Sequence, residues 1–351
     1  MESVTADPRP GGPDPAGRRV IDMHAHLLVP ERNHVVSQVP GVEEVRARTR
    51  DWIGPETRAY TASVAEVAVH ESTDTSARLV AMDAMGVDIQ AVSMSPSQYD
   101  YWVEPGVARE IVEIANEAMA ELVSSHPDRI VGIADVALGH PDLAAEQLER
   151  AVQHWGLRGE QISSRAGDRE LSSPELEPFW AAAEAVGVPV IVHPIGCSLG
   201  SRLASHFLSS TVGQPVEHAV ALSHLIFSGV LDRHPALKVF ATHGGGYLPF
   251  YLGRSDHAWQ VRPDSRGCVD LPSSYLPRMY FDSLVYRGDT LRHLLDLVGS
   301  DHVAVGSDYP YDIGVRDPVE RLSLVPGITE DERSNILYRT GSNLLGLPPD
   351  D

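Results

Sequence analysis

Cysteine is scarce in this chain, which has only Cys197 and Cys268 among its 351 residues. Two cysteines far apart in the sequence provide neither a disulfide framework nor a Cys-x-x-Cys zinc site. We interpret both as structural or incidental residues. A nucleophilic Cys197 is the alternative, because this residue follows closely after an expected strand.

Long apolar runs and basic residues are also lacking. No stretch approaches the roughly 20 apolar residues that a membrane-spanning helix needs, and the N-terminus has no basic segment followed by an apolar one. Lysine and arginine number 28 against 49 acidic residues, a formal net charge of −21, which argues against a nucleic-acid partner. We therefore expect a soluble, cytoplasmic protein without membrane or nucleic-acid partners, in which an anionic substrate needs a local arginine or a metal ion.

Apolar segments typical of strands recur along the chain, with helical patterns between them. Eight such segments are Val20–His24, Val87–Ser93, Ile130–Val136, Leu157–Ile162, Val188–His193, Leu237–Thr242, Met279–Asp282 and His302–Gly306. Eight strands that alternate with helices indicate a closed barrel of about 250 residues plus insertions. We predict an α/β fold, a distorted TIM (β/α)8 barrel over residues 19–348, although the length alone also fits two smaller domains.

Helical periodicity is clear in several connections between these strands. It predicts helices over Val107–Ser125 and Leu143–Trp155, and a third from Ser172 to Gly187 that begins with a cap residue and a proline. Thr329 and Glu332 have the spacing of a capping box, which predicts that the last helix begins there.

Two segments differ from this pattern. Residues 1–18 are rich in Pro, Gly and Asp with almost no apolar content, so we expect a disordered tail. After the first strand, about fifty residues show no clear helical or strand period, whereas such loops usually have about 2–6 residues. We predict that residues 27–75 form a lid or small insertion that contributes to substrate contacts.

Four expected strands end in residues that bind metals or transfer protons. The first ends at His24-Ala-His26, where strand alternation points both imidazoles to the same side. The others end at His193, His243 and Asp308. In a parallel barrel all strands open onto one face at their C-terminal ends, so these residues are expected to converge.

Three imidazoles and a carboxylate suit a divalent ion such as Zn²⁺, which binds nitrogen and oxygen ligands at about 2.0–2.2 Å. We assign His24, His26, His193 and Asp308 as ligands of one ion, whose bound water would have a pKa lowered towards about 7. We interpret His243, which precedes three glycines, as a general acid/base, and count Asp308 as catalytic too. The alternative is that His243 binds this ion or a second one.

Several short motifs carry a family resemblance from Ile21 to about Leu347. They are Asp22-Met-His-Ala-His26, Met82-Asp-x-x-Gly86-Val-x-x-Gln90, His126-Pro-x-Arg129, His193-Pro194, His243-Gly-Gly-Gly246, Gly253-Arg254, Arg262-Pro-Asp264 and Gly306-Ser-Asp-Tyr-Pro310. The set resembles the metal-dependent amidohydrolase superfamily, and more closely its branch of nonoxidative decarboxylases typified by 2-amino-3-carboxymuconate-6-semialdehyde decarboxylase. Any one motif alone is not specific.

The resemblance implies a TIM-like barrel with one zinc at His24, His26, His193 and Asp308, and His243 at the acid/base position. In such decarboxylases a metal-bound hydroxide, activated by the histidine, is thought to attack an unsaturated acid, and carbon dioxide then leaves without an organic cofactor. Relatives that begin with Glu-x-His often use manganese. The His-x-His pair therefore favours Zn²⁺ here, with Mn²⁺ as the other candidate.

The substrate pocket departs from the family pattern. Of the family's two carboxylate-binding arginines, the first is missing near Val69 or His70, and the second, lent by a neighbouring subunit, is matched by Arg262. The tryptophan that follows the family's His-Pro is replaced by Ile195. We expect Arg262, His70 and Tyr311 to contact the substrate, with surface roles for the first two and barrel packing for Tyr311 as alternatives. A homodimer is expected if Arg262 crosses between subunits.

The sequence thus predicts a carboxy-lyase that acts on a small unsaturated or aromatic carboxylic acid. Hydrolysis of a lactone or amide, or hydration of a double bond, is the main alternative, because fold does not choose between these reactions. A non-catalytic barrel without metal is the alternative from a different class.

Overall fold

The computed structural model describes residues 14 and 16–348, except the side chains of 49–51, and in this range parallel strands surround one core. The strands are β1 (Ile21–Leu27), β2 (Ile89–Met94), β3 (Ile130–Gly132), β4 (Glu160–Ile162), β7 (Pro189–Val192), β8 (Lys238–Ala241), β9 (Tyr280–Asp282) and β10 (Val303–Ala304). They form two sheets, β1-β2-β3 and β10-β9-β8-β7-β4. Parallel bridges from Ala134 to Glu160 and from Asp22 to Val305 join both edges, so the strands follow one another around a barrel.

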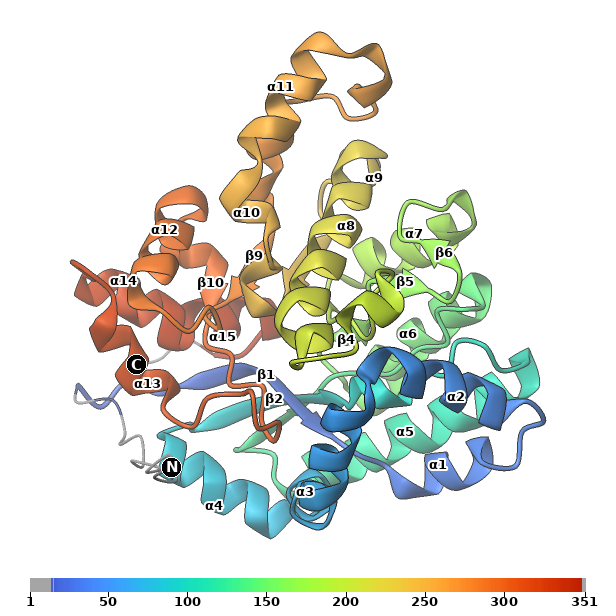
Figure 1. Cartoon of the computed structure of the whole chain (residues 1–351). Coiled ribbons are helices and arrows are strands. Elements are labelled where there is room, and N and C mark those ends of the chain that lie inside the picture. Colours follow the sequence, from blue (N-terminus) through green and yellow to red (C-terminus); the bar gives the residue numbers. More distant parts are fainter. Residues whose placement is uncertain (1–13, 15, 349–351) are drawn as a thin grey trace.

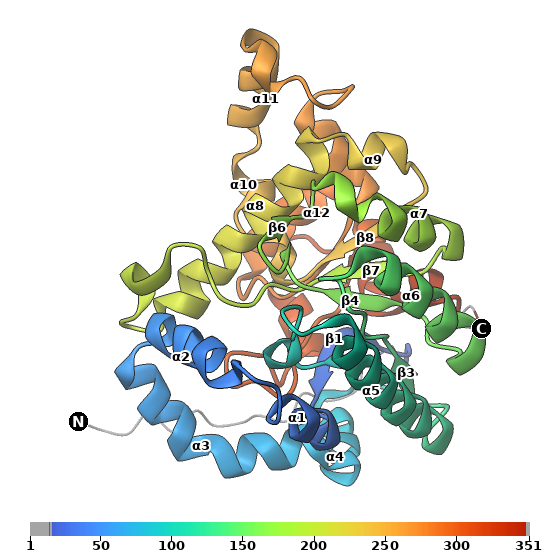
Figure 2. The ribbon, with the colours of Figure 1, turned by 90° about the vertical axis from the view of Figure 1, so that its right-hand side faces the viewer.

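Helices cover the outside of the barrel (Figures 1 and 2). They are α4 (Thr75–Met85), α5 (Pro105–Ser125), α6 (Pro141–Trp155), α7 (Glu177–Val186), α8 (Gln214–Phe227), α9 (Val230–Arg233), α12 (Gly288–Val298), α13 (Pro318–Arg321), α14 (Glu330–Ser334) and α15 (Thr340–Leu345). On α6, Leu148 and Ala151 are fully buried against the barrel, as the helical spacing of its apolar residues requires. The α/β barrel and its predicted helices are confirmed, including both hydrogen bonds of the Thr329–Glu332 capping box.

A short hairpin and a projecting arm extend the barrel. The hairpin pairs β5 (Arg165–Ala166) with β6 (Arg169–Glu170) after β4. The arm follows β8 and contains α10 (Leu248–Tyr251) and α11 (Gly253–Val261). It stands away from the barrel in both ribbon views (Figures 1 and 2).

The connection after β1 is helical, although its sequence shows no clear helical period. It forms α1 (Pro30–Val36), α2 (Val42–Ile53) and α3 (Pro55–Thr73), drawn in blue in Figure 1. Tyr60 and Val67 of α3 are 55% and 62% exposed, so this helix has no apolar stripe that periodicity could reveal. Its frequent alanines favour a helix regardless of pattern. The role of these helices as a lid stays a prediction.

The N-terminal segment is only partly described. Residues 1–13 and 15, most of the predicted disordered tail, lie outside the described residues. Asp14 is buried, and its carboxylate accepts hydrogen bonds from Arg18 Nε at 2.7 Å and from Arg333 Nε at 2.9 Å. Contacts with the barrel therefore begin before residue 19. Within the described range, no helix combines the length and hydrophobicity needed to cross a bilayer.

Glu160 is a buried acid at the start of β4. Its side chain is fully buried, and neither carboxylate oxygen has a hydrogen-bond partner among the described residues. Burial raises the pKa of Glu160 well above its ordinary value of 4.5. The unfolded chain loses this proton above pH 4.5 while the folded protein keeps it, so stability falls as the pH rises from 4.5 through the raised pKa.

We predict that Glu160→Gln removes this pH dependence, because glutamine does not ionise. Inside this window, the unfolding free energy of the variant minus that of the wild type should rise by about 1.4 kcal/mol for each unit of pH increase. Urea unfolding at several pH values measures the difference. Glu149→Gln, at an exposed position of α6, is the control. Parallel pH profiles for Glu160→Gln and wild type would contradict the prediction.

Candidate metal centre

The two histidines of β1 and the aspartate after β10 meet inside the barrel. β1 continues past His24, its expected end, to Leu27, and its pairing with β2 shifts register between Asp22 and Ala25. His24 and His26 point to the same side, with their Nε2 atoms 3.1 Å apart. Asp308 Oδ1 lies 3.2 Å from each of these nitrogens.

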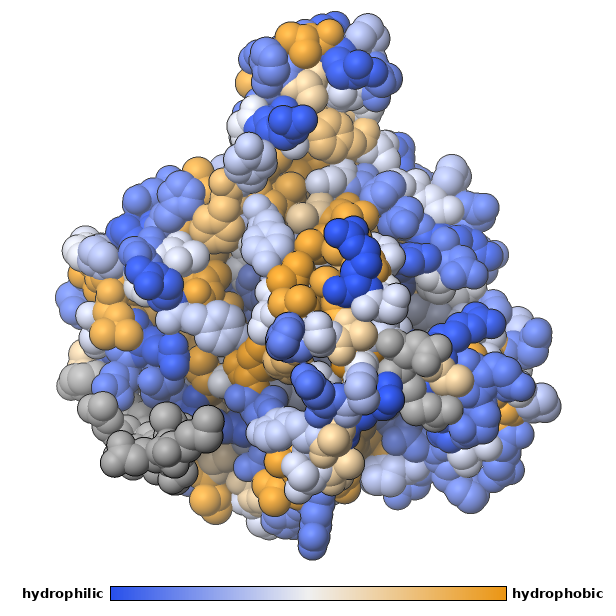
Figure 3. Space-filling view, in the orientation of Figure 1, coloured by the Kyte–Doolittle hydropathy of each residue, from blue (hydrophilic) through white to orange (hydrophobic). Residues whose placement is uncertain are grey.

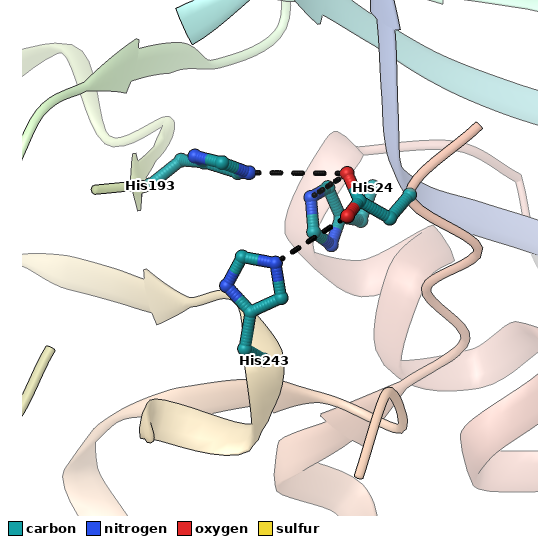
Figure 4. Close-up of side chains that lie close together, drawn as sticks. His24, His193 and His243 are labelled. Carbon is teal, nitrogen blue, oxygen red and sulfur yellow. Dashed lines mark ion pairs between the residues drawn. The ribbon is translucent and has the colours of Figure 1, made fainter. Parts of the chain in front are cut away.

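His193 and His243 complete the cluster from β7 and β8 (Figure 4). His193 Nε2 lies 3.9 Å from Asp308 Oδ1, and His243 Nε2 lies 3.5 Å from Asp308 Oδ2. The structure therefore brings together all five residues that the strand ends suggested, from four places in the sequence.

Burial makes the charges in this cluster depend on one another. Burial opposes a charge on His24, but the carboxylates of Asp308 and Asp282 outweigh it and raise the pKa of His24 to about 10. Burial lowers the pKa of His26 to about 4, and lowers that of His193 well below its ordinary value. Burial alone would raise the pKa of Asp308, but His24 and the other imidazoles hold it well below its usual range. In the protein alone, His24 thus holds a proton beside the carboxylates of Asp308 and Asp282.

A divalent ion fits this donor set. His193 Nε2 and Asp308 Oδ1 are buried atoms without a hydrogen-bond partner among the described residues, and they face each other. One donor atom from each of His24, His193, His243 and Asp308 lies within 4.8 Å of the others, and His26 Nε2 is 3.2 Å from the same aspartate oxygen. Imidazole nitrogens with a carboxylate oxygen suit Zn²⁺ and related ions, which would replace the proton on His24.

Two strained backbone positions aim these side chains. His243 has φ 52° and Asp308 has φ 59°, in the left-handed region that side chains rarely adopt. The Asp308 amide donates to the His24 carbonyl at 2.8 Å, which holds the turn against β1. Gly306 allows this turn to pack closely, because a Cβ there would lie 2.7 Å from Asp282 Cβ.

A cavity of about 780 Å³ lies at the same end of the barrel. Its walls include residues that follow the C-terminal ends of β2, β4 and β7, such as Tyr99, Ser163 and Ile195. Helix α2 contributes Trp52 and two basic residues, Arg46 and Arg48. The connection after β1 therefore lines this cavity, whose walls continue from the residues that follow His193.

A sequence model of the amidohydrolase family matches residues 21–347. The chain belongs to the amidohydrolase family. A 2-amino-3-carboxymuconate-6-semialdehyde decarboxylase from Dictyostelium discoideum is 32% identical over 79% of this chain and 77% of its own length. A gamma-resorcylate decarboxylase from Rhizobium sp. (strain MTP-10005) is 30% identical over 67% of this chain and 76% of its own. The predicted family resemblance is confirmed.

Solved structures share this fold. The structure of a 5-carboxyvanillate decarboxylase from Novosphingobium aromaticivorans, with bound manganese and 3-methoxy-4-hydroxy-5-nitrobenzoic acid, superposes with a TM-score of 0.85. It is 22% identical and covers 96% of this chain and 99% of its own. At this identity the likeness shows the fold alone.

The substrate contacts predicted for this amidohydrolase fall in different places. Tyr311 packs its ring 5.3 Å from the His26 ring, and its hydroxyl lies 2.5 Å from Ser95 Oγ. His70 lies on α3 with 62% of its side chain exposed, 3.9 Å from Asp74. Arg262 lies at the end of α11, 65% exposed and paired with Asp264 at 2.6 Å. Only Tyr311 lies beside the histidines of its own chain.

Asp282 is a site residue that the sequence reasoning missed. It is the last residue of β9, and its place at the end of an expected strand was its only signal. Its Oδ2 lies 2.7 Å from His24 Nδ1 and accepts from the His243 amide at 2.9 Å. Its Oδ1 accepts from the Gly244 amide at 2.8 Å. One buried carboxylate thus orients His24 and holds the turn that carries His243.

A second network behind β1 holds its end in place. Asp22 Oδ2 accepts from Ser307 Oγ at 2.5 Å and from Gln90 Nε2 at 2.9 Å. Arg78 joins Gln90 Oε1 to the carbonyl of His26, at 2.7 and 2.5 Å. Asp22 and Gln90 belong to motifs that the sequence already matched to the family, and these contacts give their physical role.

We predict that Asp282→Asn lowers the metal affinity of this amidohydrolase about 10–100-fold, the usual effect of losing a carboxylate behind a histidine ligand. Competition with a chelator for Zn²⁺ on the metal-free protein measures the affinity. Asp301→Asn, which changes a side chain that is 72% exposed, is the control. Equal affinities for Asp282→Asn and wild type would show that His24 does not depend on this carboxylate.

Proposed function

We propose that this amidohydrolase is a metal-dependent, nonoxidative decarboxylase of a small unsaturated or aromatic carboxylic acid. The buried centre with its two unpartnered donor atoms, His193 Nε2 and Asp308 Oδ1, is the observation that carries the proposal. Relatives that match most of this chain are named decarboxylases, which favours loss of carbon dioxide over hydrolysis or hydration in the same centre.

The reaction needs a proton donor and a place for an electron pair. When the bond to the carboxylate carbon breaks, its electron pair stays on the substrate carbon, which then takes up one proton as carbon dioxide leaves. His243, whose Nε2 faces the centre, is placed to deliver this proton. A bound divalent ion supplies Lewis acidity that stabilises the negative charge on the substrate.

The cavity walls favour a flat acid. Tyr99, Tyr101, Trp102 and Trp52 offer ring faces, while Arg46 and Arg48 offer guanidinium groups for a carboxylate. The relatives act on acids such as gamma-resorcylate and 5-carboxyvanillate, by their names. We extend this class to the present chain, in which the family's first arginine is missing and α2 supplies the basic side chains.

We propose one zinc ion held by His24, His26, His193 and Asp308, with Mn²⁺ as the other candidate. The dominance of imidazole donors supports zinc. Manganese is bound in two solved proteins of similar fold. The cytoplasmic location stays a prediction.

We predict that the zinc-loaded protein releases carbon dioxide from at least one acid in a panel of dihydroxybenzoates, carboxyvanillates and muconate-type acids. Removal of the metal by chelation should abolish turnover and added Zn²⁺ should restore it. His24→Ala, which removes a donor, should lose metal and activity together, as elemental analysis and a coupled carbon dioxide assay would show. Hydrolysis of esters or lactones without carbon dioxide would instead make the protein a hydrolase.

We propose that the protein is a homodimer in which the arm lends Arg262 to the partner's site. Three apolar residues on and beside α11 are largely exposed: Tyr251 at 73%, Val261 at 58% and Val269 at 71%. Exposed apolar surface that gathers in one place is typical of a protein–protein interface. Figure 3 shows apolar side chains between the arm and α8, where Val216, Phe227 and other residues line a groove of about 670 Å³. Arg262 ends α11 on the arm that stands away from the barrel (Figure 1), which supports a role in another chain's site.

Mixed dimers test this exchange. Homodimers of Arg262→Ala and of His243→Asn should both be impaired in decarboxylation. Co-expressed with different tags, they should form dimers in which one of the two sites keeps both residues, so about half of the wild-type activity returns. Purified mixed dimers that stay as inactive as the parents would show that Arg262 does not act across the interface.

A further inference from the structure

His218 is a buried histidine that lies behind the acid/base residue. It belongs to the first half of α8 and is fully buried. Its Nε2 lies 3.1 Å from His243 Nδ1. The other nitrogen of the His243 ring, Nε2, faces Asp308 (Figure 4). His243 therefore lies between His218 and the centre that contains Asp308.

The glycines after His243 allow this close approach. Gly246 has φ 63°, and a Cβ there would lie 2.4 Å from the Pro215 carbonyl oxygen and 2.9 Å from His218 Cβ. Any side chain at this position would push α8 away from the turn that carries His243. The sequence His243-Gly-Gly-Gly246 is thus matched to a helix that must touch the turn.

The hydroxyl of Thr242 lies beside both rings. Thr242 Oγ1 lies 3.1 Å from the Val192 carbonyl oxygen, which can only accept, so the hydroxyl donates there. The same oxygen lies 3.1 Å from His218 Nε2 and presents a lone pair to it. A proton on His218 Nε2 meets two acceptors, Thr242 Oγ1 and His243 Nδ1. A proton on His243 Nδ1 would likewise meet two, Thr242 Oγ1 at 3.3 Å and His218 Nε2, so these bonds fit a proton on either ring.

The far nitrogen of His218 decides between the two tautomers. His218 Nδ1 is buried without a hydrogen-bond partner among the described residues. Buried N–H groups without an acceptor are rarer in proteins than buried lone pairs without a donor, so the proton belongs on Nε2. Burial lowers the pKa of His218 well below its ordinary value, which leaves the ring neutral with one proton to place.

We infer that His218 is a positioning residue, which donates to His243 Nδ1 and thereby keeps the proton of neutral His243 on Nε2. In this tautomer His243 Nε2 has no lone pair for a metal ion and presents an N–H to the substrate. His243 is then a hydrogen-bond donor to the substrate rather than a fourth imidazole ligand. The catalytic meaning rests on the proposed decarboxylation, which needs a proton at the substrate carbon, whereas the tautomer itself does not.

Nitrogen NMR of the full-length protein tests the tautomer directly. The zinc-loaded, ¹⁵N-histidine-labelled protein is suitable because Zn²⁺ is diamagnetic, and His243→Asn assigns the signals. We expect a directly bonded proton on His243 Nε2 and an unprotonated Nδ1. A proton on His243 Nδ1, or a metal-coordinated Nε2, would overturn the inference. Since no turnover is needed, this result stands even if no acid releases carbon dioxide, so failure of the inference is distinguishable from failure of the proposed function.

Variants at position 218 test the positioning role. His218→Met removes the donor at similar volume, so the His243 signals should change and kcat should fall on the order of tenfold or more with KM unchanged. His218→Gln can donate from its side-chain amide and should restore both. His154→Met, at an exposed histidine of α6, is the control and should alter neither. Equal behaviour of the Gln and Met variants at position 218 would reduce His218 to packing and overturn the role. Should the Met variant fail to fold, the wild-type spectrum and the Gln variant still decide.

Discussion

A buried carboxylate at the end of the barrel is the constraint on which the rest of this structure depends. Asp308 is 2% exposed, and removing an ionised carboxylate from water is costly unless cations or donors surround it. Four imidazoles from β1, β7 and β8 surround this one, and burial lowers the pKa of two of them, His26 and His193. The arrangement is therefore complete only when a cation joins it, a proton on His24 in the protein alone and a metal ion in the proposed enzyme.

The contacts around this centre fix the positions of its side chains. Asp282 forms hydrogen bonds with the His24 ring and with the backbone amide of His243. This one side chain therefore fixes the position of His24, a proposed metal ligand, relative to His243, the proposed acid. Gly306 and Gly246 have no side chain because their neighbours already occupy the space. These contacts hold the strained backbone of His243 and Asp308 in place. Strained backbone in proteins is usually found at functional sites.

Much of this could be predicted from local pattern. Each strand is a short apolar segment buried by its neighbours, so it can be predicted from its own residues without knowledge of the rest of the chain. The histidines and the aspartate stood out because parallel strands carry chemistry at their C-terminal ends. Asp282 ended a predicted strand in the same way and was still missed, since nothing in its neighbourhood singled out a carboxylate that acts behind a ligand. Helix α3 was missed because Tyr60 and Val67 face solvent, leaving no stripe to detect.

By itself, then, the sequence determined the barrel, the family and the set of residues around the proposed metal. These follow from burial and alternation within short segments, which leave a local trace. Only the tertiary structure decided that His70 faces solvent, that Arg262 lies on an arm outside its own centre, and that His218 reaches His243 from behind. Such relations depend on the directions of side chains and on the packing of segments far apart in the chain. The periodicity within a segment carries no information about these relations. The proton on His243 could therefore be assigned only from the position of α8, which carries His218.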